Sequence, residues 1–125
     1  MQQTILIEDR LILVARCGDA PQGFTICDPT NSFMQALYVD PAASRRGIGA
    51  SLLDASETAM AASGVTTCTL FASHNAVAFY KAHGFSAGAP TSQSLADGAT
   101  LSCLTMSKQL QPNNSFKPKP LRGSA

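Results

Sequence analysis

The first third of the chain alternates short apolar runs with turn-forming residues, a pattern typical of β-strands joined by hairpins. Three such runs cover residues 11–17, 23–27 and 33–39. The segments between them, residues 18–22 and 28–31, contain the Gly, Pro, Asp and Asn residues that favour tight turns. The pattern therefore predicts three consecutive antiparallel strands.

After Gly47 the hydrophobic period changes from that of a strand to that of a helix. Apolar residues recur at steps of four and three, at Ile48, Leu52, Ala55, Ala59 and Ala62, and Leu53 and Met60 widen this apolar side. Asp54 and Glu57 fall on the opposite side, which we expect to face solvent. Ser63 and Gly64 are expected to end the helix.

A second strand and helix follow. Residues 65–72 form an apolar and threonine-rich run, and a shorter helix is expected from Ala76 to about His83, closed by Gly84. Because a helix connects residues 33–39 to residues 65–72, those two strands are expected to be parallel. A short strand at residues 91–95 and a stronger one at 99–106 complete the pattern.

These elements predict an α/β domain spanning residues 1–110. Its expected sheet is mixed and mostly antiparallel, with about six strands, a parallel pair at its centre and two helices. Residues 111–125 change to a composition rich in Pro and Lys without an apolar stripe, so we expect a flexible tail there.

Composition narrows the classes of function. Lys and Arg total 9 and Asp and Glu total 8, which gives a net charge of +1, so nucleic acid is not an expected partner. No apolar window reaches the roughly 18 residues of a membrane span, and the first residues lack the basic flank of a secretory signal. We therefore expect a cytoplasmic protein without a membrane partner.

The four cysteines give no sign of a metal site. They lie at positions 17, 27, 68 and 103, without a C-x-x-C pair. In apolar or β-like surroundings such cysteines are most simply buried free thiols of a reducing compartment. We expect neither a metal nor a disulfide.

The turn before the longer helix has the composition of a phosphate-binding site. Gly47 and Gly49 stand at the helix start, directly after Arg45 and Arg46. A helix start carries unpaired backbone N–H groups and partial positive charge, and glycine lets an anion approach the backbone closely. The spacing fits neither the Walker loop nor the G-x-G-x-x-G dinucleotide pattern, so the kind of phosphate compound is left open.

Taken together with residues 73–85, this turn resembles the GNAT superfamily of N-acetyltransferases. The family motif Q/R-x-x-G-x-G/A, after a strand that ends in a Val-Asp-Pro-like sequence, has its counterpart in residues 39–41 and 44–49. Phe79, Tyr80, Gly84 and Phe85 resemble the second family signature, and residues 105–110 resemble the last strand. The similarity covers about residues 11–110. It implies a GNAT-like fold abbreviated at the N-terminus, because only about ten residues precede the first hairpin where family members have a strand and two helices.

The resemblance also implies an activity and the residues that perform it. The activity is transfer of an acyl group, most simply acetyl from acetyl-CoA, to a primary amine by direct attack in a ternary complex. Backbone groups of Leu37, Tyr38 and Val39 would pair with the pantetheine arm, and Tyr80 would protonate the leaving thiolate. The other implied cofactor contacts are Ser44, Arg45, Arg46, Gly47, Ile48, Gly49 and Ala50 at the pyrophosphate, either Ser73 or Asn75 at pantetheine, and Phe79.

Several departures keep alternatives open. Ser44 stands where the family has Gln or Arg, Ser73 stands where it often has Asn, and no general base is identifiable. A non-catalytic acyl-CoA-binding or interaction module is therefore the alternative to an enzyme, and a phosphate-binding domain for another nucleotide is a third possibility. Exposed strand edges further lead us to expect a homodimer.

Overall fold

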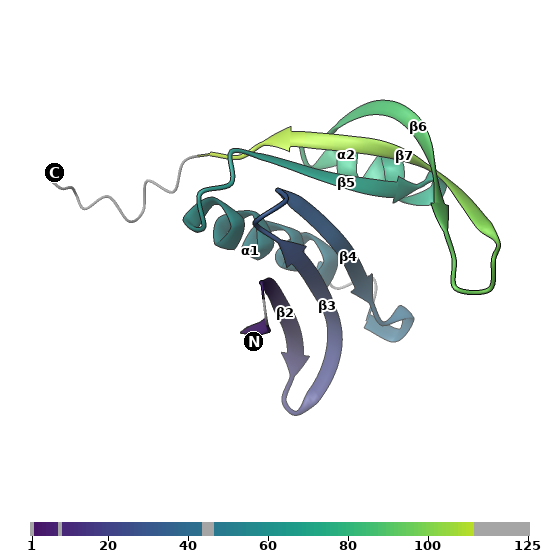
Figure 1. The fold of residues 1–125 in the computed structure, drawn as a ribbon. Coiled ribbons are helices and arrows are strands. Elements are labelled where there is room, and N and C mark those ends of the chain that lie inside the picture. The colour runs from purple at the N-terminus through teal and green to yellow at the C-terminus, as the bar shows by residue number, and fades with distance from the viewer. Residues whose placement is uncertain (1, 8, 44–46, 112–125) are drawn as a thin grey trace, which may run out of the picture.

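One mixed sheet of seven strands organises the chain. A computed structural model describes residues 2–7, 9–43 and 47–111. The strand order is β1-β2-β3-β4-β5-β7-β6, and two helices accompany the sheet (Figure 1). The elements are β1 (Gln2–Ile7), β2 (Arg10–Cys17), β3 (Ala20–Asp28), β4 (Phe33–Val39), the 3-10 turn η1 (Pro41–Ala43), α1 (Ile48–Ala62), β5 (Thr67–Ser73), the 3-10 turn η2 (His74–Ala76), α2 (Val77–Ala82), β6 (Ser86–Ser94) and β7 (Thr100–Gln109). The predicted fold class, a mostly antiparallel sheet with a central parallel pair and two helices, is confirmed.

The sheet has one strand more than the six predicted runs. β1 pairs antiparallel with β2, from Gln2 opposite Ala15 to Ile7 opposite Arg10. The expectation that no strand precedes residue 11 was therefore wrong. The apolar stretch at residues 5–7 is too short to indicate a strand alone, and pairing with the long β2 supplies what it lacks. Only residues 8 and 9 lie between the two strands, so no helix separates them.

The last hairpin is also longer than its pattern suggested. β6 begins at Ser86 rather than near residue 91, and β7 continues to Gln109. Most side chains of β6 are exposed, so hydrophobic periodicity gave little indication of this strand. Its backbone pairing with β7, from Ser86 opposite Ser107 to Ser94 opposite Thr100, defines it instead.

The sheet opens between its two central strands. β4 and β5 are parallel and pair only at Phe33 with Thr69 and at Met34 with Leu70. Beyond that point β4 contains a bulge at Gln35, because Ile26 of β3 faces Ala36 while Cys27 faces Met34. A bulge bends a strand and increases its twist. β4 and β5 consequently diverge toward their carboxyl ends (Figure 1).

Both helices cover the same face of the sheet. In Figure 1 they lie behind the strands, α1 across β3 and β4 and α2 behind β5 and β7. Leu52, Leu53 and Met60 of α1 are at most 1% exposed. Burial of such side chains stabilises the fold by about 1.5–3 kcal/mol each. The helix spans the predicted residues, but its buried side is centred on these three and Ser56, while the terminal Ala62 of the predicted stripe is exposed.

Two polar contacts fix α1 against the rest of the fold. The hydroxyl groups of Ser56 and Thr25 on β3, both fully buried, share a hydrogen bond of 2.7 Å. On the other side of the helix, Lys108 Nζ of β7 lies 2.8 Å from Glu57 Oε1 and donates a second 2.8 Å hydrogen bond to the carbonyl of His83. The expectation that Glu57 simply faces solvent was therefore wrong, because a side chain from β7 reaches it.

The remaining expectations about the whole chain have mixed outcomes. Cys27, Cys68 and Cys103 are buried free thiols as predicted, but Cys17 is exposed because it ends β2 at the hairpin turn. No helix in the described ranges is long and apolar enough to cross a bilayer. The predicted tail lies outside the described residues except for its first residue, Gln111.

Candidate active site

A groove forms where the start of α1 meets the end of β4. Its volume is about 300 Å³, and its walls are Leu37, Val39, Gly47, Gly49, Ala50 and Phe79. Gly47 has φ +73°, a conformation that side-chain-bearing residues rarely adopt, and it lets the chain turn sharply into the helix. A Cβ on Gly49 would lie 3.5 Å from the Phe79 ring and 3.6 Å from Val39 Cγ2, so glycine keeps the groove wide here.

The first backbone N–H groups of α1 lie at this groove. The N–H groups of a first helical turn have no partner within the helix and attract anions. The N-cap residue, Gly47, supplies no side-chain hydrogen bond to them. Ile48 does not line the groove, since its side chain packs against the buried cluster of Leu13, Ala15 and Leu52. Ile48 therefore contributes its backbone, whereas Gly49 and Ala50 form part of the wall.

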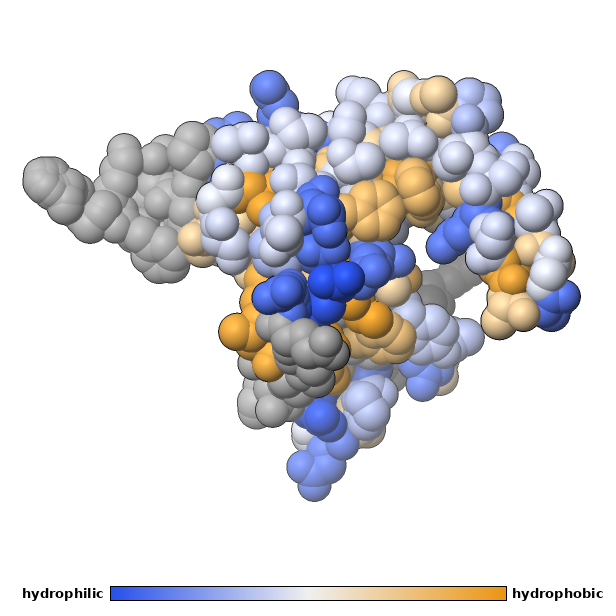
Figure 2. All heavy atoms as spheres, in the orientation of Figure 1, coloured by the Kyte–Doolittle hydropathy of each residue, from blue (hydrophilic) through white to orange (hydrophobic). Residues whose placement is uncertain are grey.

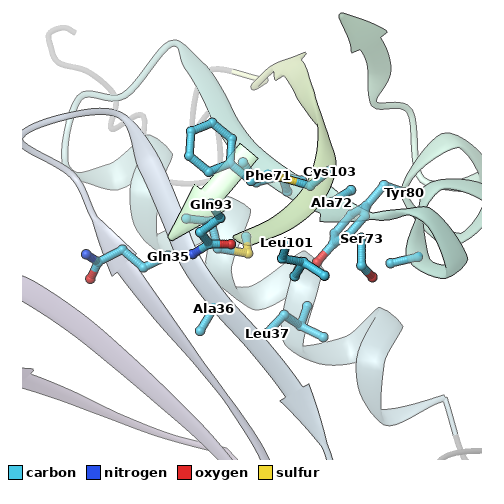
Figure 3. A pocket seen from close by; sticks show the side chains of 13 residues that line it. Gln35, Ala36, Leu37, Phe71, Ala72, Ser73, Tyr80, Gln93, Leu101 and Cys103 are labelled. Carbon is cyan, nitrogen blue, oxygen red and sulfur yellow. The ribbon is translucent and has the colours of Figure 1, made fainter. Parts of the chain in front are cut away.

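A second hollow lies in the opening between β4 and β5. It is a cavity of about 230 Å³ lined by Met34, Gln35, Ala36, Leu37, Leu70, Phe71, Ala72, Ser73, Ala76, Tyr80, Gln93, Leu101 and Cys103. Figure 3 shows Tyr80 and Ser73 entering from the α2 side and Gln35 at the other side, with Gln93 and Leu101 between them. Leu37 lines both hollows, so the groove and the cavity meet at this residue.

Tyr80 is held firmly in the cavity wall. Its ring packs edge-on against Phe79 at 5.2 Å and Phe85 at 5.6 Å between centroids, and the residue is only 8% exposed. Its hydroxyl has no hydrogen-bond partner among the described residues. Burial raises the pKa of Tyr80 above its ordinary value, and the neighbouring Cys68 thiol adds to the rise. The phenol is therefore protonated at neutral pH and able to donate a proton.

Some of the predicted site residues line the groove or the cavity, and others do not. Leu37, Val39, Gly47, Gly49, Ala50, Phe79, Tyr80 and Ser73 line the groove or the cavity. The Tyr38 side chain lies instead in a groove on the opposite face of the sheet, so only its backbone is available to the opening. Asn75 is exposed and lines neither hollow, whereas Ser73 does. Ser44, Arg45 and Arg46 lie outside the described residues.

Several cavity residues gave no signal in the sequence. Gln93, Leu101 and Cys103 come from the β6 and β7 hairpin, and Phe71 comes from β5. They reach the cavity only because β7 inserts between β5 and β6 and because β4 moves away from β5. No spacing between residues along the chain predicts this arrangement of strands. The bulge at Gln35 likewise depends on the register with β3.

Comparisons with known proteins relate the chain to a family and to solved structures. Residues 8–87 match the acetyltransferase (GNAT) domain family. No curated protein sequence matches the chain. Among solved structures, a GCN5-related N-acetyltransferase from Rhodopseudomonas palustris is 33% identical with a TM-score of 0.75, covering 81% of this chain and 62% of its own. The chain thus spans less than two thirds of that relative.

Two further solved structures share the fold and contain a coenzyme. The PaiA N-acetyltransferase from Thermoplasma acidophilum, solved with coenzyme A, is 23% identical with a TM-score of 0.63, covering 81% of this chain and 61% of its own. The protein yncA from Salmonella typhimurium, solved with its cofactor acetyl-CoA, is 20% identical with a TM-score of 0.64, covering 82% and 65%. With a family match over more than half of its residues, the chain belongs to the GNAT family of acetyltransferases.

Proposed function

We propose that the protein is an N-acetyltransferase that moves the acetyl group of acetyl-CoA to a primary amine by direct attack. The observation that carries this proposal is the meeting of the groove and the cavity at Leu37. The groove at a helix start suited to phosphate and the cavity with the protonated phenol of Tyr80 thereby share a wall at Leu37. A long ligand with phosphates near one end and a reactive group at the other would extend from the groove past Leu37 into the cavity.

The pantetheine arm is proposed to lie along β4. β3 pairs with one side of Leu37, Tyr38 and Val39, while the ladder to β5 stops at Met34. The outward backbone groups of these residues can therefore pair with an extended ligand as an added strand would. The pyrophosphate is proposed to bind at the start of α1, where the backbone N–H groups from Gly47 to Ala50 and the side chains of residues 44–46 would contact it. Ser73 is proposed as the side-chain contact to pantetheine, because it lines the cavity while Asn75 does not.

Tyr80 is proposed as the general acid. Bound acetyl-CoA supplies an activated thioester, and the neutral amine of the acceptor attacks its carbonyl carbon. As the carbon–sulfur bond breaks, the Tyr80 hydroxyl donates its proton to the leaving sulfur. The amide nitrogen loses its extra proton to water, through which the phenolate recovers a proton. The residues that line the cavity include no carboxylate, so we assign no side chain as base.

Thiol release tests the enzymatic proposal. The full chain is incubated with acetyl-CoA and a panel of primary amines, and free coenzyme A is followed with a thiol-reactive dye. We expect amine-dependent release with at least one acceptor class. Binding of acetyl-CoA is measured separately by calorimetry, and at about 100 times its Kd the ligand should stabilise the fold by about 2.7 kcal/mol.

A non-catalytic acyl-CoA-binding module is the second candidate. The observation that favours it is the two-residue connection between β1 and β2. This connection contains no helix that could form a wall where an acceptor amine would bind. Saturable binding without thiol release from any amine would favour the module over the enzyme. Stabilisation by ATP in place of acetyl-CoA would contradict both.

A further inference from the structure

The face of the sheet opposite the helices carries a second apolar surface. On β2, Leu13 and Ala15 pack against Leu52 of α1, so the alternating residues Ile12 and Val14 point to the other side. On β3, Thr25 bonds to Ser56 of α1, which turns Phe24 and Ile26 away from the helix. We name this surface the open face; it comprises Ile12, Val14, Phe24, Ile26 and Tyr38.

The open face is hollowed and hydrophobic. A groove of about 390 Å³ runs over it, lined by Ile12, Val14, Arg16, Pro21, Gln22, Gly23, Phe24, Tyr38 and Asp40. Phe24 and Tyr38 are 36% and 50% exposed, with ring centroids 5.6 Å apart. Figure 2, in the orientation of Figure 1, shows some hydrophobic residues at the surface in the lower half of the molecule, where Figure 1 places β2 to β4, with hydrophilic residues above and below them. A solvated sheet face normally carries polar side chains, whereas the unbroken apolar run from Leu11 to Ala15 is typical of a strand buried on both faces.

Charges at the rim indicate which partner fits. β2 and β4 both run antiparallel to β3, so they point in the same direction and end at the same edge of the groove. Arg16 stands near the end of β2, where its Nη1 donates a 3.3 Å hydrogen bond to the carbonyl of Asp19. Asp40 stands directly after the end of β4, where its Oδ1 accepts a 3.0 Å hydrogen bond from the N–H of Ala42. Two copies can stack with their open faces together, related by a two-fold axis that runs parallel to β3. In this arrangement β2 of one copy lies over β4 of the other. Arg16 would then face the partner's Asp40, and the same pair would form again across the axis.

We propose that the open face is a docking surface for a second copy of this chain. The two sheets pack face to face with aligned strands, the arrangement found in β-sandwiches. Phe24 lies next to the axis and packs on its own counterpart, while Tyr38 packs on the strand that carries the partner's Val14. Because the interface is isologous, it closes as a dimer and leaves no further open face.

Analytical ultracentrifugation of the full chain over a concentration series tests the proposal. We expect a concentration-dependent monomer–dimer equilibrium. Phe24→Glu should raise the dimer Kd by at least about tenfold, since central aromatic residues dominate such interfaces. Leu95→Glu is the matched control: Leu95 is 43% exposed at the β6–β7 turn, away from the open face, so dimerisation should be unchanged. Circular dichroism checks that each variant is folded.

A charge exchange tests the orientation without relying on Phe24. Arg16→Glu and Asp40→Lys should each weaken the dimer, and the double variant should recover most of the loss, because each rim pair is then restored with opposite sign. A full chain that remains monomeric up to about 100 μM, which corresponds to a free energy of association weaker than about −5.5 kcal/mol, would overturn the proposal. Dimerisation that Phe24→Glu leaves intact while Leu95→Glu abolishes it would overturn it equally.

Discussion

Replacing Tyr80 by Phe removes one hydroxyl and leaves almost everything else in place. The ring contacts with Phe79 and Phe85 involve only carbon atoms, and the hydroxyl has no hydrogen-bond partner among the described residues. The free energy of unfolding should therefore change by less than about 1 kcal/mol. Any large loss of activity in this variant reports the missing proton donor.

The size of that loss follows from the role of the hydroxyl. General acid catalysis contributes about 10²–10⁴-fold, and a thiolate is a good leaving group even without a proton, which places this case at the low end. We expect kcat to fall about a hundredfold, which corresponds to about 2.7 kcal/mol of activation free energy. Affinity for acetyl-CoA should stay within about a factor of three, because the proposed cofactor contacts lie mainly on β4 and α1.

Steady-state thiol release gives kcat, calorimetry gives the affinity for acetyl-CoA, and thermal unfolding gives stability. The pH profile adds an independent readout. Because burial raises the pKa of Tyr80 above 10, its titration should limit activity only on the alkaline side of that pH. A Tyr80→Phe variant with wild-type kcat would refute the assigned role. So would a variant in which activity and cofactor affinity fall by the same factor, since that result indicates a damaged binding site.

Gly49→Val should narrow the groove at the start of α1 and weaken acetyl-CoA binding about tenfold or more while leaving thermal stability close to wild type; equal affinity by calorimetry would contradict the proposed phosphate site. Ser56→Ala should cost about 1–3 kcal/mol in urea unfolding, because it strands the buried hydroxyl of Thr25, and adding Thr25→Val should recover part of that loss; a double variant as unstable as the sum of both would refute the coupling. Lys108→Met keeps the aliphatic stem but loses the ion pair and the carbonyl contact, so we expect about 2 kcal/mol of destabilisation, largely insensitive to salt because the pair is half-buried. Burial raises the pKa of Cys68 from 9.0 to about 12, so the folded state keeps a proton that the unfolded state loses; stability should be full below pH 9 and decline between pH 9 and 12, and Cys68→Ala should flatten that decline.

The elements with strong periodicity were predictable because local preference and packing agree in them. The strand runs at residues 11–17 and 33–39 and the helix after Gly47 appear where the pattern predicts them. Gly47 precedes this helix in a left-handed conformation, which glycine adopts without strain. A position in the core can nevertheless be polar: the buried hydroxyl of Ser56 finds the hydroxyl of Thr25 on β3, and no periodicity along the chain indicates that partner.

The sequence predicted the parts of the candidate site that short motifs define, but not the parts that distant segments bring together. Tyr80 and the glycine turn follow from short motifs, whereas the cavity wall requires long-range strand order. Gln93 and Leu101 face Tyr80 because β7 lies between β5 and β6. β1 was missed for a related reason, since its pairing with β2, rather than its own pattern, makes it a strand.

The opening in the sheet lies within one packed framework of strands and helices. One continuous core cluster joins Met34 of β4, Leu53 of α1 and Leu70 of β5, and Tyr80 belongs to the same cluster. The halves of the sheet are therefore packed together on the helix face, while the bulge at Gln35 separates their strands beyond Met34. Because such a core is close-packed, we expect the position of the Tyr80 hydroxyl relative to the groove to be set before any ligand binds. Under the proposed function, such preorganisation would favour direct transfer, because a bound thioester and the Tyr80 hydroxyl would need no closing motion to align. Packing of a second copy on the open face would stiffen β4 from its other side, through the Tyr38 side chain, and so support the strand on which pantetheine is proposed to lie.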